Sequence, residues 1–171
     1  MFKSYGFTVS ELVIVMAILA IISCFAYPCF QDFMASNELN HAKRILTIHI
    51  QKAKSDSQIY HKNVMLCPSQ DFIHCHSDWN QGFIGFIDSN QNRLRDDDEP
   101  LLYQVNLNYR YGSLNYRGFG RSPNYLVFQK ENGLPLASNG HFHYCSNHSQ
   151  GALKVILSRM GQIHYEKFPN C

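Results

Sequence analysis

The sequence predicts an α+β protein in which a long N-terminal, membrane-spanning helix packs on a globular domain of antiparallel β-sheet. Three observations predict this fold class. Residues 7–30 form an apolar run with one charged side chain, and apolar residues at helical spacing extend the pattern to about residue 60. Short apolar and aromatic runs separated by turn residues follow in 61–171. This last part is long enough for one small domain with its own core, and no repeat or linker divides it.

The apolar run 7–30 is long enough to cross a membrane. As an α-helix it would measure about 36 Å, and the hydrocarbon core of a bilayer is about 30 Å thick. Its one charged residue is Glu11, in the first turns. An ionised side chain near the bilayer centre costs roughly 2.5 to 3.5 kcal/mol, so an intramembrane carboxylate is first interpreted as functional. Glu11 therefore needs a partner or must reach the lipid headgroups.

The residues that flank this run predict its orientation. Lys3 is the one charged side chain among the six residues that precede it, which favours a cytoplasmic N-terminus and an exported C-terminal domain. A secretory signal would have a shorter apolar core followed by small residues at a cleavage site, whereas Tyr27, Pro28 and Cys29 stand near the end of this run. We therefore expect a single-pass inner-membrane protein with residues 61–171 in the periplasm.

One continuous helix is predicted for residues 7–60. Pro28 lies inside it, and a bend is expected there because proline lacks an amide proton and crowds the preceding turn. Beyond residue 30 the pattern becomes amphipathic, with charged residues mostly on one side. The apolar face expected to contact the domain consists of Phe33, Met34, Leu39, Ala42, Ile45, Leu46, Ile48, His49 and Ala53.

Seven strands are predicted in the domain, in one or two antiparallel sheets that face the helix. Each is a short apolar or aromatic run bounded by turn residues. The runs lie at 63–66, 82–87, 101–105, 124–128, 140–144, 152–157 and 162–165. Residues 109–123, which are rich in glycine, tyrosine and arginine, are expected to form the longest loop.

Two cysteines lie in the apolar run and four in the exported part. Cys24 and Cys29 are five residues apart on a helix, so they do not face each other and are expected to pack as small apolar side chains. The other four are Cys67, Cys75, Cys145 and Cys171. An even number outside the cytoplasm favours disulfides, and four cysteines allow three connectivities. We predict Cys67–Cys75, which closes a short loop, and Cys145–Cys171, which holds the C-terminus.

A zinc site is the competing interpretation of these cysteines. The candidate zinc ligands are Cys67, His74, Cys75, His76, His141, His143 and Cys145. Adjacent side chains of an extended chain point to opposite faces, the CxxC spacing is missing, and an oxidising compartment competes for the thiols, so disulfides are favoured. No Ser/His/Asp context of a catalytic nucleophile is present either. We expect no enzymatic activity and no cofactor.

An acidic segment has the spacing of a calcium loop. Asp88, Asn90, Asn92, Asp96 and Glu99 occupy places 1, 3, 5, 9 and 12 of the 12-residue pattern. Place 6, where the sharp turn requires glycine, is an arginine, a second arginine follows two residues later, and predicted strands rather than helices flank the segment. A solvated acidic turn is therefore the favoured interpretation, and calcium is the alternative.

The N-terminal motif resembles that of a known superfamily. The segment Gly6-Phe-Thr-Val-Ser-Glu11, followed by an apolar helix that contains Pro28, is similar to the class III signal of type IV pilins. The resemblance implies that residues 1–6 are a leader, that a prepilin peptidase cleaves between Gly6 and Phe7, and that the enzyme methylates the new N-terminal Phe7. It also implies that Glu11 neutralises the N-terminal ammonium of a neighbouring subunit in a filament.

Physical chemistry supports this pairing. An unpaired charge inside an apolar bundle is strongly unfavourable, whereas an ammonium and a carboxylate in contact compensate each other and fix the axial register of the helices. The partners implied by the resemblance are other major and minor pilins, bound through the N-terminal helix, the prepilin peptidase and an inner-membrane assembly platform.

The domain carries a second resemblance, to the FimT/FimU minor pilins, whose domain is shared with the type II secretion pseudopilin GspH. It rests on Cys67-Pro-Ser, Cys75, the segment 79–92 from Trp79 to Asn92, Glu99-Pro-Leu-Leu, Phe128, Gly133, Gly140-His-Phe, Cys145 and Val155-Ile-Leu-Ser before Gly161. The implied function is that of a minor pilin that helps initiate or prime pilus assembly and supports adhesion, twitching or DNA uptake. The alternative is a GspH-like pseudopilin of type II protein secretion.

Some FimT-like pilins bind DNA in natural transformation through a C-terminal Gly-Arg-x-Arg motif. The matching positions here begin at Gly161 and hold no arginine, and the formal net charge of the chain is only +2. DNA affinity depends mainly on phosphate neutralisation by Lys and Arg, so this role is the weaker alternative. The residues that could contact nucleic acid are Arg117, Arg121, Arg159 and Lys167.

Overall fold

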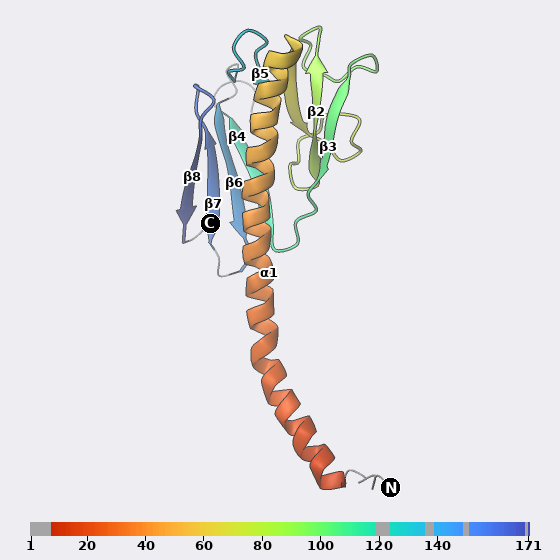
Figure 1. Cartoon of the computed structure of the whole chain (residues 1–171), viewed down its shortest axis with the longest axis vertical. Helices are drawn as coiled ribbons and strands as arrows, with labels where there is room; N and C mark the ends of the chain where they lie inside the picture. Colours follow the sequence, from red (N-terminus) through yellow and green to blue (C-terminus); the bar gives the residue numbers. More distant parts are fainter. Residues whose placement is uncertain (1–7, 119–123, 136–138, 149–150, 170) are drawn as a thin grey trace, which may run out of the picture.

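A single long helix, α1 (Val9–Tyr60), runs through the molecule and projects far beyond the domain (Figure 1). The computed structural model describes residues 8–118, 124–135, 139–148, 151–169 and 171. Thr8 caps the helix: its side chain accepts a hydrogen bond from the Glu11 amide, and the Glu11 side chain accepts one from the Thr8 amide. His61 ends the helix in the left-handed conformation, with φ of 51°. The predicted helix is confirmed from Val9 onward.

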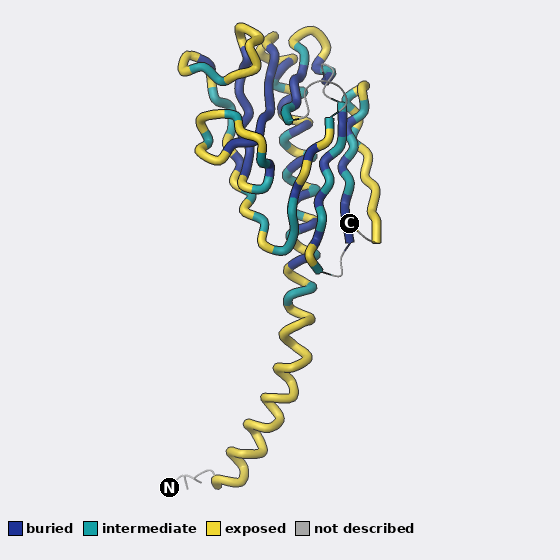
Figure 2. The backbone as a smooth tube through the Cα atoms, turned by 180° about the vertical axis from the view of Figure 1, so that it is seen from behind, coloured by how far each residue is buried: buried dark blue, intermediate teal, exposed yellow. Residues whose placement is uncertain are grey.

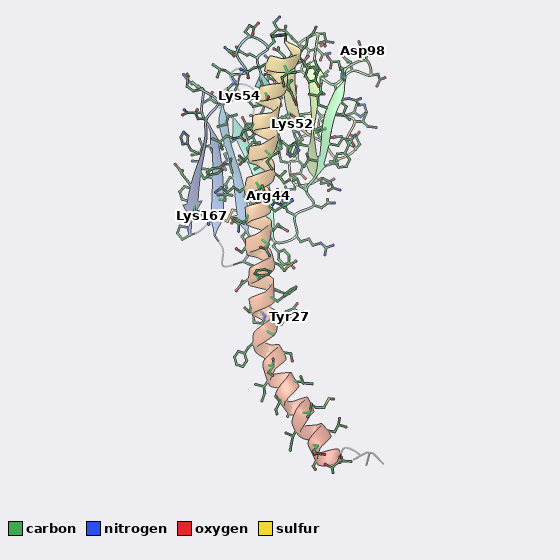
Figure 3. All side chains as sticks on the ribbon, in the orientation of Figure 1. Tyr27, Arg44, Lys52, Lys54, Asp98 and Lys167 are labelled. Atoms are coloured by element: carbon green, nitrogen blue, oxygen red, sulfur yellow. A yellow bond between two sulfur atoms is a disulfide. The ribbon has the colours of Figure 1, made fainter. Side chains whose placement is uncertain are left out.

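The helix continues through Pro28. Its lower part, residues 9–30, is inclined relative to the part that packs on the domain, and Tyr27 lies near the bend (Figures 1 and 3). A proline inside a helix removes one hydrogen bond and pushes the preceding turn away, which is a sufficient cause for a bend at this place.

The upper part of α1 buries a narrow stripe of side chains that recur every three or four residues. They are Ala35, Leu39, Ala42, Leu46, Ile50, Ala53 and Ser57. Small residues alternate with Leu and Ile, so the sheets can approach the helix backbone closely. The predicted apolar face was too broad, because Phe33, Met34 and Ile48 are exposed and lie off this stripe. The domain therefore contacts less of the helix surface than its hydrophobic pattern indicates.

Two four-stranded antiparallel sheets flank the upper half of α1 (Figure 1). The first has the order β3-β2-β1-β5 and consists of β1 (Asn63–Pro68), β2 (Gly82–Asp88), β3 (Leu101–Asn106) and β5 (Leu126–Phe128). The second has the order β4-β6-β7-β8 and consists of β4 (Gly112–Gly118), β6 (Gly140–Ser146), β7 (Ala152–Leu157) and β8 (Ile163–Phe168). The helix contacts both sheets.

The seven predicted strands are confirmed, but the prediction of a long loop at 109–123 was wrong. Strand β4 lies inside that segment and pairs along its whole length with β6, from Gly112 opposite Ser146 to Gly118 opposite Gly140. Gly112 allows the close approach of β6 rather than a turn, because a Cβ atom there would collide with the Cys145 carbonyl and the Tyr144 ring. Residues 119–123 lie outside the described part of the chain.

The core lies between the two sheets and the helix stripe. Trp79 is 3% exposed and packs edge-on against Phe142, with ring centroids 4.8 Å apart. Both predicted disulfides are present, with Cα atoms 5.5 Å apart in Cys67–Cys75 and 5.7 Å apart in Cys145–Cys171. The first closes the loop after β1, and the second joins the C-terminus to β6. The thiolates that a zinc site would need at these positions are therefore absent.

Candidate functional site

The lower part of α1 is the largest exposed apolar surface in the described structure. Its side chains are exposed on all sides; Val9 and Phe25, for example, are 80% and 75% exposed. Figure 2 shows this half of the helix uncovered throughout. It is also long and apolar enough to cross a membrane, by length and composition alone. An apolar surface of this extent marks a membrane or protein interface, and a helix that is apolar all round must be buried in one of them.

Glu11 lies at the N-terminal end of this apolar surface. Its carboxylate accepts hydrogen bonds from the Thr8 amide and the Thr8 hydroxyl, each at 2.9 Å, within the capping box. A carboxylate in the first turn of a helix is favoured by the unpaired amides and the dipole of that end. The isolated subunit thus holds an anion, oriented and solvent-exposed, one turn from the end of the helix. The predicted cleavage site, Gly6 and Phe7, lies outside the described residues.

Cys24 and Cys29 are free and exposed on the same half of α1. No disulfide joins them, as expected for two cysteines five residues apart on a helix. Their environment is set by whatever covers this surface, so the expected apolar packing stays a prediction.

Glu38 connects the helix to the second sheet. It accepts hydrogen bonds from the amides of Arg110 and Tyr111, each at 2.9 Å, and from the Tyr144 hydroxyl at 2.6 Å. Burial raises the pKa of Tyr144, and the hydrogen bond to Glu38 raises it further. Glu38 was not predicted as a functional residue from the sequence. The sequence did contain a signal for this contact. Glu38 is an acidic residue directly beside Leu39, an apolar residue of the buried stripe, and a carboxylate at that place needs a partner from the domain.

The predicted nucleic-acid contacts do not form one surface. Directly paired residues of adjacent strands share a sheet face, and Arg117 is paired with His141 on the face of the second sheet away from the helix. Lys167 is paired with the core residue Leu153, so it lies toward the opposite face at the sheet edge, where Figure 3 labels it. Arg159 lies in the turn between β7 and β8. Arg121 lies outside the described residues.

The outer face of the second sheet carries a set of basic side chains that differs from the predicted nucleic-acid contacts. Arg117, His141, His143 and Lys154 line one shallow hollow together with Phe168 and Cys171. Burial lowers the pKa of His141, and the nearby Lys154, His143 and Arg117 lower it further. The pKa of His141 is therefore below its usual 6.5, so this side chain becomes positively charged only on acidification. The alternation of His141 and His143 was the sequence signal for a shared face, but it was considered only as a zinc pattern.

The acidic segment predicted as a turn or calcium loop connects β2 to β3. Asp88 is the last residue of β2, and Glu99 lies two residues before β3. Both carboxylates are buried. In the described part of the chain, no three His, Cys, Asp or Glu side chains gather in an arrangement that could hold a metal by themselves.

The fold and the uncovered apolar helix define a membrane-anchored filament subunit of the pilin class. Residues 44–161 match the family described as "Type II transport protein GspH", and residues 1–27 match the "Prokaryotic N-terminal methylation motif". The first match covers more than half of the chain. The chain therefore belongs to the GspH family, the family of minor type IV pilins and pseudopilins with a GspH-like domain.

The proteins that this chain resembles include a fimbrial protein, a type IV minor pilin and a type II secretion pseudopilin. The "Fimbrial protein EcpB" of Eikenella corrodens is 35% identical over 74 residues, which are 43% of this chain and 45% of EcpB. The crystal structure of the type IV minor pilin FimU of Pseudomonas aeruginosa matches with a TM-score of 0.60 and 19% identity, over 78% of this chain and 92% of FimU. The minor pseudopilin EpsH of Vibrio cholerae matches with a TM-score of 0.52 and 8% identity, over 76% of this chain and 97% of EpsH. At these identities the structural matches establish the fold alone.

Proposed function

We propose that this protein is a minor type IV pilin that helps initiate or prime pilus assembly and thereby supports adhesion, twitching or DNA uptake. It acts as a structural subunit rather than an enzyme. The observation that carries the proposal is the uncovered apolar half of α1 with Glu11 at its end, a surface that a filament of like helices would bury. The fimbrial relative and the likeness to FimU support a pilus as that filament.

The assembly step follows from the residues at the end of the helix. A prepilin peptidase would cleave between Gly6 and Phe7 and methylate Phe7, leaving an ammonium next to the Thr8 cap. In the filament, Glu11 would exchange its bonds with Thr8 for the ammonium of a neighbouring subunit, which satisfies both charges in an apolar environment. Before assembly the chain would be held in the inner membrane by residues 7–30, with residues 61–171 in the periplasm, where the assembly platform adds it to other pilins.

A second candidate function is that of a pseudopilin in type II protein secretion. The family match to GspH and the likeness to EpsH favour it, and the two structural matches cover similar shares of the chain. The same helix and the same Glu11 would serve a pseudopilus. A DNA receptor has less support, because the predicted contacts are distributed over two sheet faces and a turn.

Deletion of the gene in its own host, followed by complementation, separates these functions. Surface pili, natural transformation and secreted enzymes are measured in the same strains. Loss of pili, restored by the wild-type gene, supports the proposal. Loss of secretion with normal pili overturns it in favour of the pseudopilin, and loss of transformation with normal pili and secretion overturns it in favour of the DNA receptor. Mass spectrometry of the purified subunit tests whether the mature chain begins at a methylated Phe7.

A further inference from the structure

The register of the second sheet aligns basic side chains in neighbouring rows across its outer face. Directly paired residues of adjacent strands share a face. One row holds Arg117 on β4 and His141 on β6. The next row holds His143 on β6, Lys154 on β7 and Glu166 on β8. Nothing in the proposed filament function makes use of these side chains, because the face they share is turned away from α1.

A shallow hollow of about 320 Å³ lies on this face. Its lining consists of Arg117, His141, His143, Lys154, Phe168 and Cys171. Phe168 belongs to a third row, in which Ala152 lies between it and Cys145, and the disulfide to Cys145 holds Cys171 beside that row. The ring of Phe168 is 40% exposed. The hollow is therefore basic over two rows and apolar at the third.

The basic side chains of the hollow have unused hydrogen-bond donors. Among the described residues, the Arg117 guanidinium and the rings of His141 and His143 form no hydrogen bond and no ion pair. Lys154 has an acidic neighbour in Glu166, with 3.9 Å between Nζ and Oε2, and both side chains are partly exposed. An exposed ion pair of this length contributes little. Within these rows, one carboxylate at the sheet edge therefore faces two permanent cations and two histidines.

These basic side chains repel one another. Cβ atoms of directly paired residues lie about 5 Å apart, and like charges placed opposite each other destabilise a sheet. Arg117 is opposite His141, and His143 is opposite Lys154. Burial lowers the pKa of His141, Lys154, His143 and Arg117 lower it further, and Glu166 acts in the opposite direction. An anion in the hollow would relieve this repulsion and accept the unused N–H groups.

We propose that this hollow binds a phosphate monoester, with the phosphate group held by the side chains of Arg117, His141, His143 and Lys154 and the organic part directed toward Phe168. A monoester carries about −1.5 to −2 charges at pH 7, which matches Arg117 and Lys154 better than the single charge of a carboxylate. Arginine offers a planar fork of donors that fits phosphate, and lysine binds it as a point charge. The inference holds whichever filament the chain joins.

The test uses the full-length chain in an uncharged detergent at pH 7 and 0.1 M KCl, where charges more than about 10 Å apart are screened. Phenyl phosphate, inorganic phosphate and benzoate are titrated separately by calorimetry. Phenyl phosphate should bind with Kd on the order of 1 mM, and benzoate, which has the same ring but one charge, at least about tenfold more weakly. Equal binding of benzoate, or no binding heat at 10 mM phenyl phosphate, would overturn the proposal. Inorganic phosphate distinguishes the two sources of the anion: weaker binding supports an ester, and equal binding overturns the ester in favour of the free ion.

Charge-matched variants locate the anion. Arg117→Gln and Lys154→Gln should each weaken phenyl phosphate binding by roughly three- to fivefold, the range for a partly exposed charge pair. Arg159→Gln removes the same charge from the turn between β7 and β8 and should change Kd by less than about twofold. Equal weakening by Arg159→Gln would show diffuse attraction and no site. The Tm of each variant is compared with that of the wild type, and two independent variants keep the test informative if one of them unfolds.

Titration of His141 reports whether the hollow is occupied. Its ring is followed by NMR between pH 7.5 and pH 5, with phenyl phosphate or with KCl of the same ionic strength, and His141→Gln identifies its signal. An anion beside the ring favours the protonated form, so the ligand should raise the pKa of His141, and it should affect His164, in the same row on the edge strand β8, less. Binding heat without a change at His141 would place the ligand elsewhere and overturn the proposal. Displacement of phenyl phosphate by a short DNA duplex at equal phosphate concentration would overturn it in favour of a phosphodiester polymer.

Discussion

The lower half of α1 is apolar on all sides and the upper half on one face, and the two halves are stabilised in different ways. The lower half has no partner in the described structure, whereas the upper half buries one stripe of alternating small and branched residues against two sheets. Capping at Thr8 and the helix's own hydrogen bonds define the lower half, and tertiary packing defines the upper half. One continuous helix can therefore serve two interfaces, one completed within the subunit and one left for assembly. Substitutions in the two halves should therefore affect different measurements.

Removal of the Glu11 carboxylate should give the largest effect, and only on assembly. Breaking a buried ion pair typically costs 3 to 5 kcal/mol, and about 1.4 kcal/mol corresponds to a factor of ten in an equilibrium constant. We expect Glu11→Ala to lower incorporation into sheared filaments more than tenfold, measured by immunoblot against the membrane fraction. The Tm of the domain should stay unchanged, because among the described residues Glu11 forms its hydrogen bonds with Thr8 and not with the domain. Ser10→Ala, in the same exposed turn, serves as the control and should assemble normally.

Truncation of Leu46 should have the converse effect. Leu46 is 2% exposed in the centre of the stripe, and Leu→Ala in a core costs about 2 to 5 kcal/mol because it leaves a cavity. We expect this loss in urea unfolding of the full-length protein, with the membrane anchor intact. Leu19→Ala, on the lower half at 57% exposure, is the matched control and should leave the unfolding free energy within about 0.5 kcal/mol of the wild type. Equal losses for the two variants would contradict the division of the helix.

Glu38 lies near the lower end of the buried stripe and joins the helix to the second sheet by hydrogen bonds. Glu38→Ala leaves two amides and the Tyr144 hydroxyl without their acceptor, and hydrogen bonds to charged groups contribute about 1.5 to 3 kcal/mol. We expect a loss of this size in the free energy of unfolding, and faster amide exchange at Arg110 and Tyr111. Glu131→Ala, at an exposed turn, removes the same charge and should change stability little. Slow exchange at these amides in Glu38→Ala would show that other bonds hold the strand.

The smallest expected effect is on pH dependence and belongs to the outer face of the second sheet. The folded-state pKa of His141 is lowered, so protonation favours the unfolded chain, and its contribution is present above its unfolded pKa near 6.5 and lost as the pH falls. We expect His141→Gln to lose less stability than the wild type between pH 7.5 and pH 5. The control is His164→Gln, an exposed histidine on the same face. A steeper pH profile in His141→Gln would reverse the assigned direction.

The helix and the seven strands that consist of short apolar runs could be predicted from the sequence, because local periodicity and residue type are visible along the chain. The presence of disulfides followed from the four cysteines of the exported part, and the predicted choice among the three connectivities is confirmed by the structure. The sequence also located Glu11 and the motif around it, because a lone carboxylate in an apolar run is conspicuous without any knowledge of the fold. Cleavage and methylation at Gly6 and Phe7 stay predictions.

Features that depend on pairing between distant segments became visible in the folded chain alone. Strand β4 was missed because its glycines resemble turn residues until β6 lies beside them, and the buried stripe of α1 proved narrower than its apolar face. The register of the second sheet separated Arg117 from Lys167 and brought Arg117 next to His141. The left-handed backbone conformation of Arg93 could not be predicted either, nor could the buried side-chain oxygen of Asp88, Oδ1, that has no hydrogen bond among the described residues. Backbone conformation and burial at one residue are set by the whole fold around it.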